Sequence, residues 1–359
     1  MAKARKGRGV GWQVASAMLL AGAALIEARR RRPVRTAPRQ SRPSAGGDDG
    51  RGRRAQSPGE IPRRGWRDIL LRASREFSQD QVPMIAAGVT FYSILALFPG
   101  LAAAISLYGL IADPADIPRH LQALSTVLPG GALTVIGHEM DRLVSHRSGG
   151  LSLTAAAGLA ASIWSANGAV KSLMTGLNIA YEEQEKRGFL KKTLVSLAFT
   201  LGLVVFGLAA MGVLGAGPVL ERRLGTAAAW LFEAASWPVL LAAMATGLAL
   251  LYRYGPSRDP VRFRWISWGV AAAVIVWLGM SAGYTLYVAN FGHFNKTYGS
   301  LGAAIGFMMW IYLSAMVVLA GAELNAELEH QTTVDTTRGA PRPMGTRRAR
   351  MADTAGRRP

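Results

Sequence analysis

The chain has 359 residues; half of them are hydrophobic and only 18% are charged, yet the formal net charge is +19. Charged and apolar residues must therefore be segregated, which is typical of a membrane protein with basic tails rather than of two or three soluble domains. With no cysteine, the chain can form neither a disulfide framework nor a thiolate metal site.

The first 65 residues are basic and are predicted to be mostly disordered. Residues 29–64 are rich in Arg, Pro, Gly and Ser and show no apolar periodicity. An apolar run at residues 14–26 is short for a membrane-spanning helix, so it is interpreted as a short anchor or a membrane-surface helix. A cleaved signal peptide would fit its length, but cleavage would export the arginines that follow. Residues 330–359 are likewise predicted to form a disordered basic tail.

The stretch "WRDILLRASREFSQD" begins at Trp66 and has the pattern of an amphipathic helix. Its apolar residues recur at helical spacing, and its arginines take the other side. The apolar set is Trp66, Ile69, Leu70, Ala73 and Phe77, and the basic set is Arg67, Arg72 and Arg75. Such a helix is expected to lie at the cytoplasmic interface of the membrane, or to pack beneath the helix bundle as a cap.

A membrane domain is predicted over residues 66–329, with an all-α fold. Six apolar stretches are long enough to cross a bilayer, which needs about 20 helical residues. They are residues 84–111, 151–180, 193–217, 227–252, 266–290 and 300–322. Because the hydrocarbon offers backbone groups no water, such stretches are expected to be transmembrane helices.

The distribution of basic residues tests this six-helix arrangement. With the N-terminus inside, the four inner segments hold 19, 4, 4 and 7 Lys and Arg residues, whereas the three outer loops hold 3, 2 and 1. Every inner segment exceeds every outer loop, as the positive-inside rule requires. Both termini are therefore predicted to be cytoplasmic. The longest outer loop, residues 112–150, is predicted to form two short amphipathic helices folded over the outer face.

The first predicted transmembrane helix contains Pro99, which removes a backbone hydrogen bond and is expected to kink the helix. Tyr92 and Ser93 lie about two turns earlier. They are candidates either to satisfy the freed carbonyl or to line a cavity.

The second predicted transmembrane helix carries polar residues on one face. Trp164, Asn167, Lys171 and Asn178 are spaced 3, 4 and 7 residues apart. Polar groups within a membrane helix normally face the bundle interior or water. Lys171 is expected either to extend toward the cytoplasm or to form a paired charge in the interior.

Two GxxxG pairs lie in the last two predicted transmembrane helices, Gly279 with Gly283 and Gly302 with Gly306. Such pairs let helices approach closely, and they also suggest a homo-oligomer.

The sixth predicted transmembrane helix ends in "AELNAELE", which places three carboxylates near the cytoplasmic surface. Glu327 and Glu329 are expected to be in water. Glu323 is expected at the edge of the hydrocarbon, paired with Lys171 or with an arginine of residues 67–75.

Motifs of soluble enzymes are missing. There is no HExxH, P-loop, GxSxG or nucleotide-binding GxGxxG, and five scattered histidines form no metal constellation. No metal site, cofactor or catalytic residue is therefore assigned. Nothing in the sequence argues for an enzyme, although nothing excludes one.

Three stretches carry a resemblance to a known family. They are "AAGVTFYSILALFPGL" (86–101), "WSANGAVKSLMTGLNIAYEE" (164–183) and "NKTYGSLGAAIGFMMWIYLSAMVVLAGAELNAELE" (295–329). Their order and spacing resemble the YihY/BrkB family of bacterial inner-membrane proteins over residues 66–329. The resemblance implies six transmembrane helices. The family's virulence-factor name and old ribonuclease label imply no secure activity and supply no catalytic residues.

The leading hypothesis is a multi-pass inner-membrane protein that transports or flips a small or lipid-like substrate. Its polar site would comprise Tyr92, Ser93, Asn167, Lys171, Asn178 and Glu323. The alternative is a scaffold or envelope-maintenance protein whose basic segments bind anionic lipids of the cytoplasmic face. A membrane-bound ribonuclease ranks last. A nucleic-acid partner is disfavoured because the basic runs lack interleaved aromatic residues.

Overall fold

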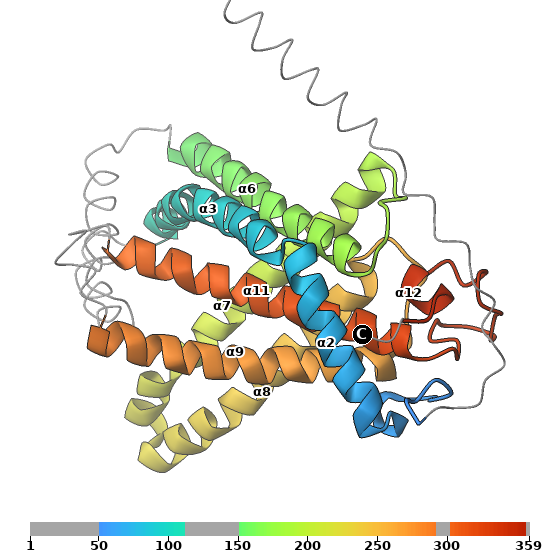
Figure 1. Ribbon diagram of the computed structural model, residues 1–359. Helices are drawn as coiled ribbons and strands as arrows, with labels where there is room; N and C mark the ends of the chain where they lie inside the picture. The colour runs from blue at the N-terminus through green and yellow to red at the C-terminus, as the bar shows by residue number, and fades with distance from the viewer. Residues whose placement is uncertain (1–49, 112–150, 292–301, 357–359) are drawn as a thin grey trace, which may run out of the picture. The chain divides into compact units, whose positions relative to one another are not determined.

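The computed structural model describes residues 50–111, 151–291 and 302–356, and these residues are helical apart from loops and one isolated β-bridge. The predicted apolar segment 14–26 and the predicted helices of residues 112–150 lie outside the described residues. Seven long helices and two short ones are described (Figure 1). The long ones are α2 (Arg63–Gln79), α3 (Val82–Ile111), α6 (Leu151–Ala180), α7 (Phe189–Leu224), α8 (Thr226–Tyr254), α9 (Phe263–Phe291) and α11 (Gly302–Gln331); the short ones are η1 (Pro58–Glu60) and α12 (Arg350–Asp353).

The prediction of an all-α membrane bundle is confirmed, but the count of six transmembrane helices stays a prediction. By length and composition, four of the described helical segments can cross a membrane. They are Phe189–Ala210, Thr226–Tyr254, Phe263–Val288 and Ala304–Gln331. A fifth is possible if Arg63–Gln79 and Val82–Leu97 are one broken segment. Many large apolar side chains on these helices are exposed, as expected for surfaces in contact with lipid.

Helix α11 is the centre of the packing. It contacts α3, α6 and α9, and α2 lies across it (Figure 1). Leu319 of α11 and Leu177 of α6 are buried in the main core with Ile266 of α9. The core therefore lies where α11 meets the ends of its neighbours.

One close helix contact lies at a glycine outside the predicted GxxxG pairs. A methyl group on Gly176 of α6 would lie 2.7 Å from Leu319 Cδ2, so α6 and α11 can approach closely only without a side chain there. A methyl group on Gly279 or Gly283 would meet no described atom within 4 Å. These two glycines therefore mediate no close contact within the described part of the chain. At Gly306 the same methyl would make an ordinary contact with Tyr284, 3.4 Å away.

A sharp bend separates α2 from α3, and the kink expected at Pro99 stays a prediction. Helices α2 and α3 meet at an angle of 59°, and Gln81 between them has a positive φ of 53°. Helix α3 continues through Pro99. One turn before this proline, Ser162 of α6 donates a hydrogen bond of 3.0 Å to the carbonyl of Ala96. A neighbouring helix thus supplies a donor to the carbonyls near the proline.

The C-terminal segment differs from the predicted disordered tail. Thr332 donates a hydrogen bond of 2.7 Å to the carbonyl of Ala55, and Thr337 pairs with Val261 in the isolated β-bridge. Met351 and Ala352 of α12 are buried. Hydroxyl and backbone groups of residues 332–356 find partners on segments far away in sequence, so this part of the chain packs against the bundle.

Candidate functional site

A groove with a volume of about 340 Å³ lies between α3 and α6, and we call it the α3–α6 groove. Its lining contains hydroxyl, amide, amine and aromatic groups. The residues are Tyr92, Leu95, Trp164, Ser165, Asn167, Gly168, Lys171, Ser172 and Thr175. The side chain of Trp164 is 78% exposed, so the groove is open at the surface of the described helices.

The wall of the groove depends on a close contact between the two helices. A methyl group on Gly168 would lie 2.7 Å from the Tyr92 ring, so this ring rests against the bare backbone of α6. Asn167 is buried beside it, and its Oδ1 accepts no hydrogen bond from the described residues. The groove therefore contains an acceptor available to a ligand or water.

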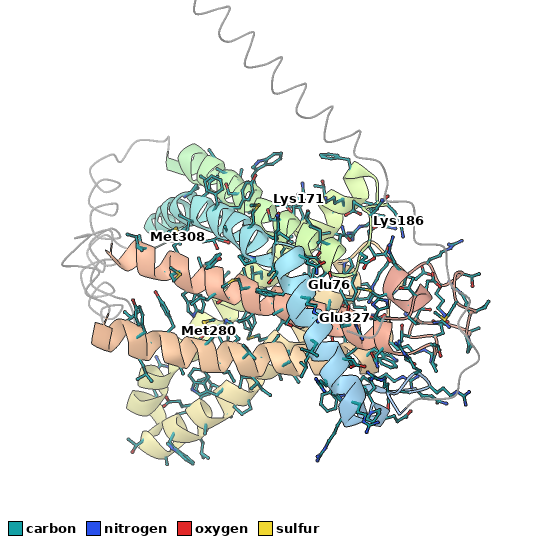
Figure 2. All side chains as sticks on the ribbon, viewed as in Figure 1. Glu76, Lys171, Lys186, Met280, Met308 and Glu327 are labelled. Atoms are coloured by element: carbon teal, nitrogen blue, oxygen red, sulfur yellow. The ribbon has the colours of Figure 1, made fainter. Side chains whose placement is uncertain are left out.

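Lys171 is the cation of the groove (Figure 2). It is half-buried, and its Nζ lies 5.7 Å from the centroid of the Phe189 ring. No carboxylate of the described residues lies within ion-pair distance of it. The lysine thus forms no paired interior charge within the described part of the chain, and it faces a space that an anion can enter.

Three of the residues assigned to the polar site do not line the groove. Ser93 Oγ donates to the carbonyl of Val89 in its own helix, at 2.8 Å. Asn178 lies at the end of α6, where its Oδ1 accepts a hydrogen bond of 2.7 Å from the Ser257 amide and its Nδ2 donates one of 3.2 Å to Glu185. Asn178 therefore joins two loops, and Glu323 lies elsewhere.

The loop that follows α6 is held by a network of charges. Arg187 donates to both oxygens of Glu185, at 2.7 and 3.0 Å, and to the carbonyl of Gly255, at 2.7 Å. Partial burial alone would raise the pKa of Glu185, but the hydrogen bonds and charge of Arg187 outweigh it and lower the pKa to about 2. Glu185 is thus ionised at neutral pH and holds Arg187, whose guanidinium fixes the loop to the end of α8.

The expectation that Glu327 and Glu329 lie in water is wrong. Both side chains are buried where α11 meets α2 and the loop before α9, a region that we call the polar end. Glu327 pairs with Arg72 of α2, and Glu329 accepts hydrogen bonds of 3.0 and 2.6 Å from Arg258. Each carboxylate is compensated by an arginine that the sequence places far from it.

Asn325, between the two glutamates, is also buried. Its Oδ1 accepts a hydrogen bond of 2.9 Å from the Gly269 amide, and Gly269 has no side chain to hold α9 away from α11.

The expected ion pair of Glu323 is also wrong within the described part of the chain. Its side chain is 1% exposed, and neither carboxyl oxygen has a hydrogen-bond donor among the described residues. The group that faces it is another carboxyl, that of Asp80 at the bend between α2 and α3. Glu76 and Glu327 lie nearby, where α2 crosses α11 (Figure 2). Asp80 and Glu76 were not recognised as site residues, because nothing in their local sequence connects them with α11.

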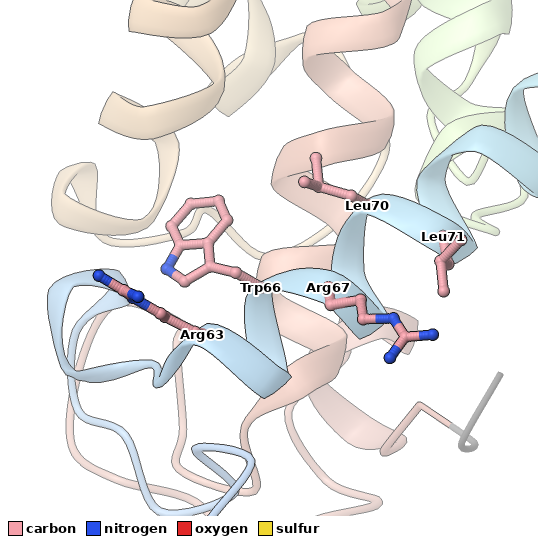
Figure 3. A pocket seen from close by; sticks show the side chains of 5 residues that line it. All are labelled: Arg63, Trp66, Arg67, Leu70 and Leu71. Atoms are coloured by element: carbon pink, nitrogen blue, oxygen red, sulfur yellow. The ribbon is translucent and has the colours of Figure 1, made fainter.

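A shallow hollow of about 480 Å³ lies on the outer face of α2. It is lined by Arg63, Trp66, Arg67, Leu70 and Leu71 (Figure 3). The ring of Trp66 lies 5.2 Å from that of Trp268 in α9. Apolar and basic side chains thus share this face, whereas Arg72, which was predicted to be on the basic face, is buried against Glu327.

No group of three or more His, Asp or Glu side chains in residues 50–111, 151–291 and 302–356 is placed to hold a metal ion.

The chain is similar to several bacterial membrane proteins. It is 27% identical over 253 residues to YfkH of Bacillus subtilis, whose name describes it as ribonuclease-like; the match covers 68% of this chain and 88% of YfkH. It is 25% identical over 290 residues to a UPF0761 membrane protein of Tolumonas auensis, covering 76% and 91% of the two chains.

A UPF0761 membrane protein of Verminephrobacter eiseniae is 28% identical over 279 residues, with 75% of this chain and 64% of that protein covered. The chain thus spans less than two thirds of the length of this relative and several others. No solved structure matches. Residues 73–345 match the sequence profile of the family described as Virulence factor BrkB. Because that match covers most of the chain, this multi-pass membrane protein belongs to the BrkB family.

Proposed function

We propose that this chain moves an anionic, lipid-like molecule across the bacterial inner membrane and binds it in the α3–α6 groove. The observation that carries the proposal is the position of Lys171. Its ammonium group lines a groove that is open at the surface of the described helices, and no described carboxylate neutralises it. A charged group at membrane depth is costly, so its retention in a groove suggests a ligand of opposite charge.

The other groups of the groove fit the two parts of an amphiphile. The hydroxyls of Ser172 and Thr175 and the amide of Asn167 can hydrogen-bond a headgroup whose anion meets Lys171. The exposed ring of Trp164 and the side chain of Leu95 offer an apolar surface to a hydrocarbon chain. A few polar groups beside a large apolar surface are characteristic of sites for small amphiphilic ligands.

The proposal keeps both termini and the polar end in the cytoplasm, as the distribution of basic residues predicts. A homo-oligomer through the face of Gly279 and Gly283, which no described atom covers, remains part of the proposal.

The test measures lipid movement in proteoliposomes. Full-length protein is reconstituted with a trace of fluorescent phosphatidylglycerol or fluorescent phosphatidylcholine, and translocation is followed as loss of fluorescence to a membrane-impermeant quencher. We expect faster movement of the anionic lipid than in protein-free vesicles. Lys171→Gln should slow it about tenfold, since loss of a charge-assisted contact of about 1.4 kcal/mol corresponds to that factor. Lys171→Arg should retain most of the activity.

The matched control is Lys191→Gln, which removes the same charge from an exposed residue outside the groove lining. Equal rates for Lys171→Gln and the wild type would refute the assigned site. Rates equal to those of empty vesicles for the wild type, with both lipids, would refute lipid translocation.

A scaffold that docks on anionic membrane surfaces is the second candidate, and the hollow on α2 favours it. Arg63 and Arg67 flank exposed Leu70 and Leu71, as in helices that lie in the headgroup region. Replacing both arginines by glutamine should abolish a scaffold function in cells and leave lipid movement in vesicles unchanged. A second variant for the same comparison lacks the basic residues 1–47. The deletion stops there because residues 51–55 are hydrogen-bonded into the fold.

The ribonuclease-like name of YfkH suggests a third reading for this chain, cleavage of RNA. Purified protein incubated with labelled RNA would test it, and cleavage that copurifies with the protein through every column would favour it.

A further inference from the structure

Glu323 is an ionisable group that the proposed groove does not use. Its side chain is 1% exposed, and no described donor reaches either of its carboxyl oxygens. Buried polar groups are nearly always hydrogen-bonded, and an unpaired buried charge is strongly unfavourable. The carboxyl group of Glu323 must therefore be stabilised by something other than a hydrogen bond from a described donor.

Among the described residues, the charged groups that act on Glu323 are acidic, and Glu182, which follows α6, adds a further negative charge near Asp80. Asp80 faces it from the α2–α3 bend, Glu76 from α2, and Glu327 from its own helix. Tyr181, directly after α6, also lies near it, with a buried hydroxyl beside the side-chain amide of Asn325.

The nearby cations contact other carboxylates of α11. Arg72 and His330 contact Glu327, and Arg258 contacts Glu329. These contacts leave Asp80 and Glu323 facing each other as two acids.

Two facing carboxylates repel each other and have only acceptor atoms, so no hydrogen bond can form between them. A single proton changes both properties at once. It removes one negative charge, and it provides the O–H donor that the other carboxylate accepts. Carboxyl pairs that share one proton in this way occur in proteins where two acids are forced together.

We propose that Asp80 and Glu323 form a proton-binding site that joins the α2–α3 bend to α11. With one proton bound, an O–H···O hydrogen bond links the two carboxyls, and the pair carries a charge of −1. When the proton leaves to water, the hydrogen bond is lost, and the pair carries −2 in a buried place. The repulsion then favours separation of the bend from α11 and admits water to the polar end.

This inference rests on the proposed function only in its consequence: if the chain moves a lipid-like anion, proton release at this pair couples the opening of the polar end to transport. The site itself is tested without any substrate.

The first measurement is the infrared absorption of protonated carboxyl groups in the full-length protein in lipid bilayers. We expect a protonated-carboxyl band near neutral pH that is lost on alkalinisation. The band should be missing in Glu323→Gln, an isosteric change that leaves the site with the charge of −1 that the protonated pair has, and in Asp80→Asn. Glu233→Gln on the exposed face of α8 should retain it. A band that persists in both site variants would overturn the proposal.

The second measurement uses the absence of cysteine from the chain. Val82, at the start of α3, is 2% exposed, whereas Ser78 at the end of α2 is exposed. The rate at which a thiol-reactive reagent labels Val82→Cys is divided by the rate for Ser78→Cys. This ratio corrects for the increase of thiol ionisation with pH. We expect the ratio to rise with pH, by up to tenfold per pH unit, because opening is linked to loss of one proton.

In the Glu323→Gln background the ratio should be low and independent of pH. A ratio that is flat in the wild type, or that rises equally in Glu323→Gln, would overturn the proposal. Neither readout involves Lys171 or lipid movement, so failure here is distinct from failure of the proposed function.

Discussion

The buried ion pair between Arg258 and Glu329 leads to a sharp prediction about stability. Both side chains are fully buried, and two hydrogen bonds join them. Thr336 donates a third, of 3.0 Å, to the same carboxylate, and the guanidinium lies 4.0 Å from the centroid of the Tyr181 ring. Arg258→Met keeps much of the apolar volume but leaves the carboxylate buried with one hydroxyl donor.

Breaking such a pair from one side costs about 3–5 kcal/mol, because the remaining charge has no compensation. Arg342 and Asp259 form the matched control, since their side chains are 41% and 34% exposed and their atoms lie 2.8 Å apart. Solvent screens that pair, so Arg342→Met should cost at most about 1 kcal/mol. The double variant Arg258→Met/Glu329→Gln should be more stable than Arg258→Met alone.

The assay is equilibrium unfolding in mixed micelles at neutral pH, followed by tryptophan fluorescence and by circular dichroism to test for a single transition. The double variant completes a cycle that isolates the interaction between the two residues. The reasoning is refuted if Arg258→Met lowers the free energy of unfolding no more than Arg342→Met does. It is also refuted if the double variant is as unstable as the sum of its single changes.

Two further predictions concern the groove and the loop after α6. Gly168→Ala would place a methyl 2.7 Å from the Tyr92 ring, so it should lower the free energy of unfolding by about 1–3 kcal/mol. Gly279→Ala, with no described atom within 4 Å of the new methyl, should be neutral or slightly stabilising. Equal effects of the two changes in thermal unfolding would contradict the close contact at Gly168. The lowered pKa of Glu185 stabilises the folded state above its ordinary value of 4.5, and this contribution disappears as the pH falls toward about 2. Glu185→Gln should therefore lower the free energy of unfolding at neutral pH and weaken its dependence on pH between those two pKa values. An unchanged pH dependence in acid would argue against the Arg187 contact.

The long apolar helices were predictable because their apolar length specifies them, whereas α2 was predictable from its amphipathic spacing. The predicted stretch 266–290 corresponds to α9, Phe263–Phe291, and differs from it by three residues or fewer at each end. The predicted stretch 300–322 ends nine residues before α11 does, at Gln331. The added residues include Glu327 and Glu329. Their local sequence is typical of a solvated helix end, because it does not show that Arg72 and Arg258 pair with them in the fold.

The candidate site was partly predictable for the same reason. Helical spacing placed Asn167 and Lys171 on one face, and both line the groove with Tyr92. Spacing along α6 could not show that Asn178, on the same face, would meet Ser257 from a loop 79 residues away. The sequence predicted a helix boundary between residues 80 and 84, but no pattern in it indicated the bend that brings Asp80 to Glu323.

The contacts of the C-terminal segment constrain the order in which this protein folds. Arg53 hydrogen-bonds the carbonyls of Gln331 and Gly356, which lie 278 and 303 residues later in the chain. At a synthesis rate of about 5–20 residues per second, the N-terminal partner waits roughly 15–60 s for the last of these carbonyls to be made. Assembly around Arg53 is therefore a late step, because it cannot finish before residue 356 has been made. Chains released early would keep their helices and lack these closing contacts, which gives a quality-control protease a simple way to recognise them.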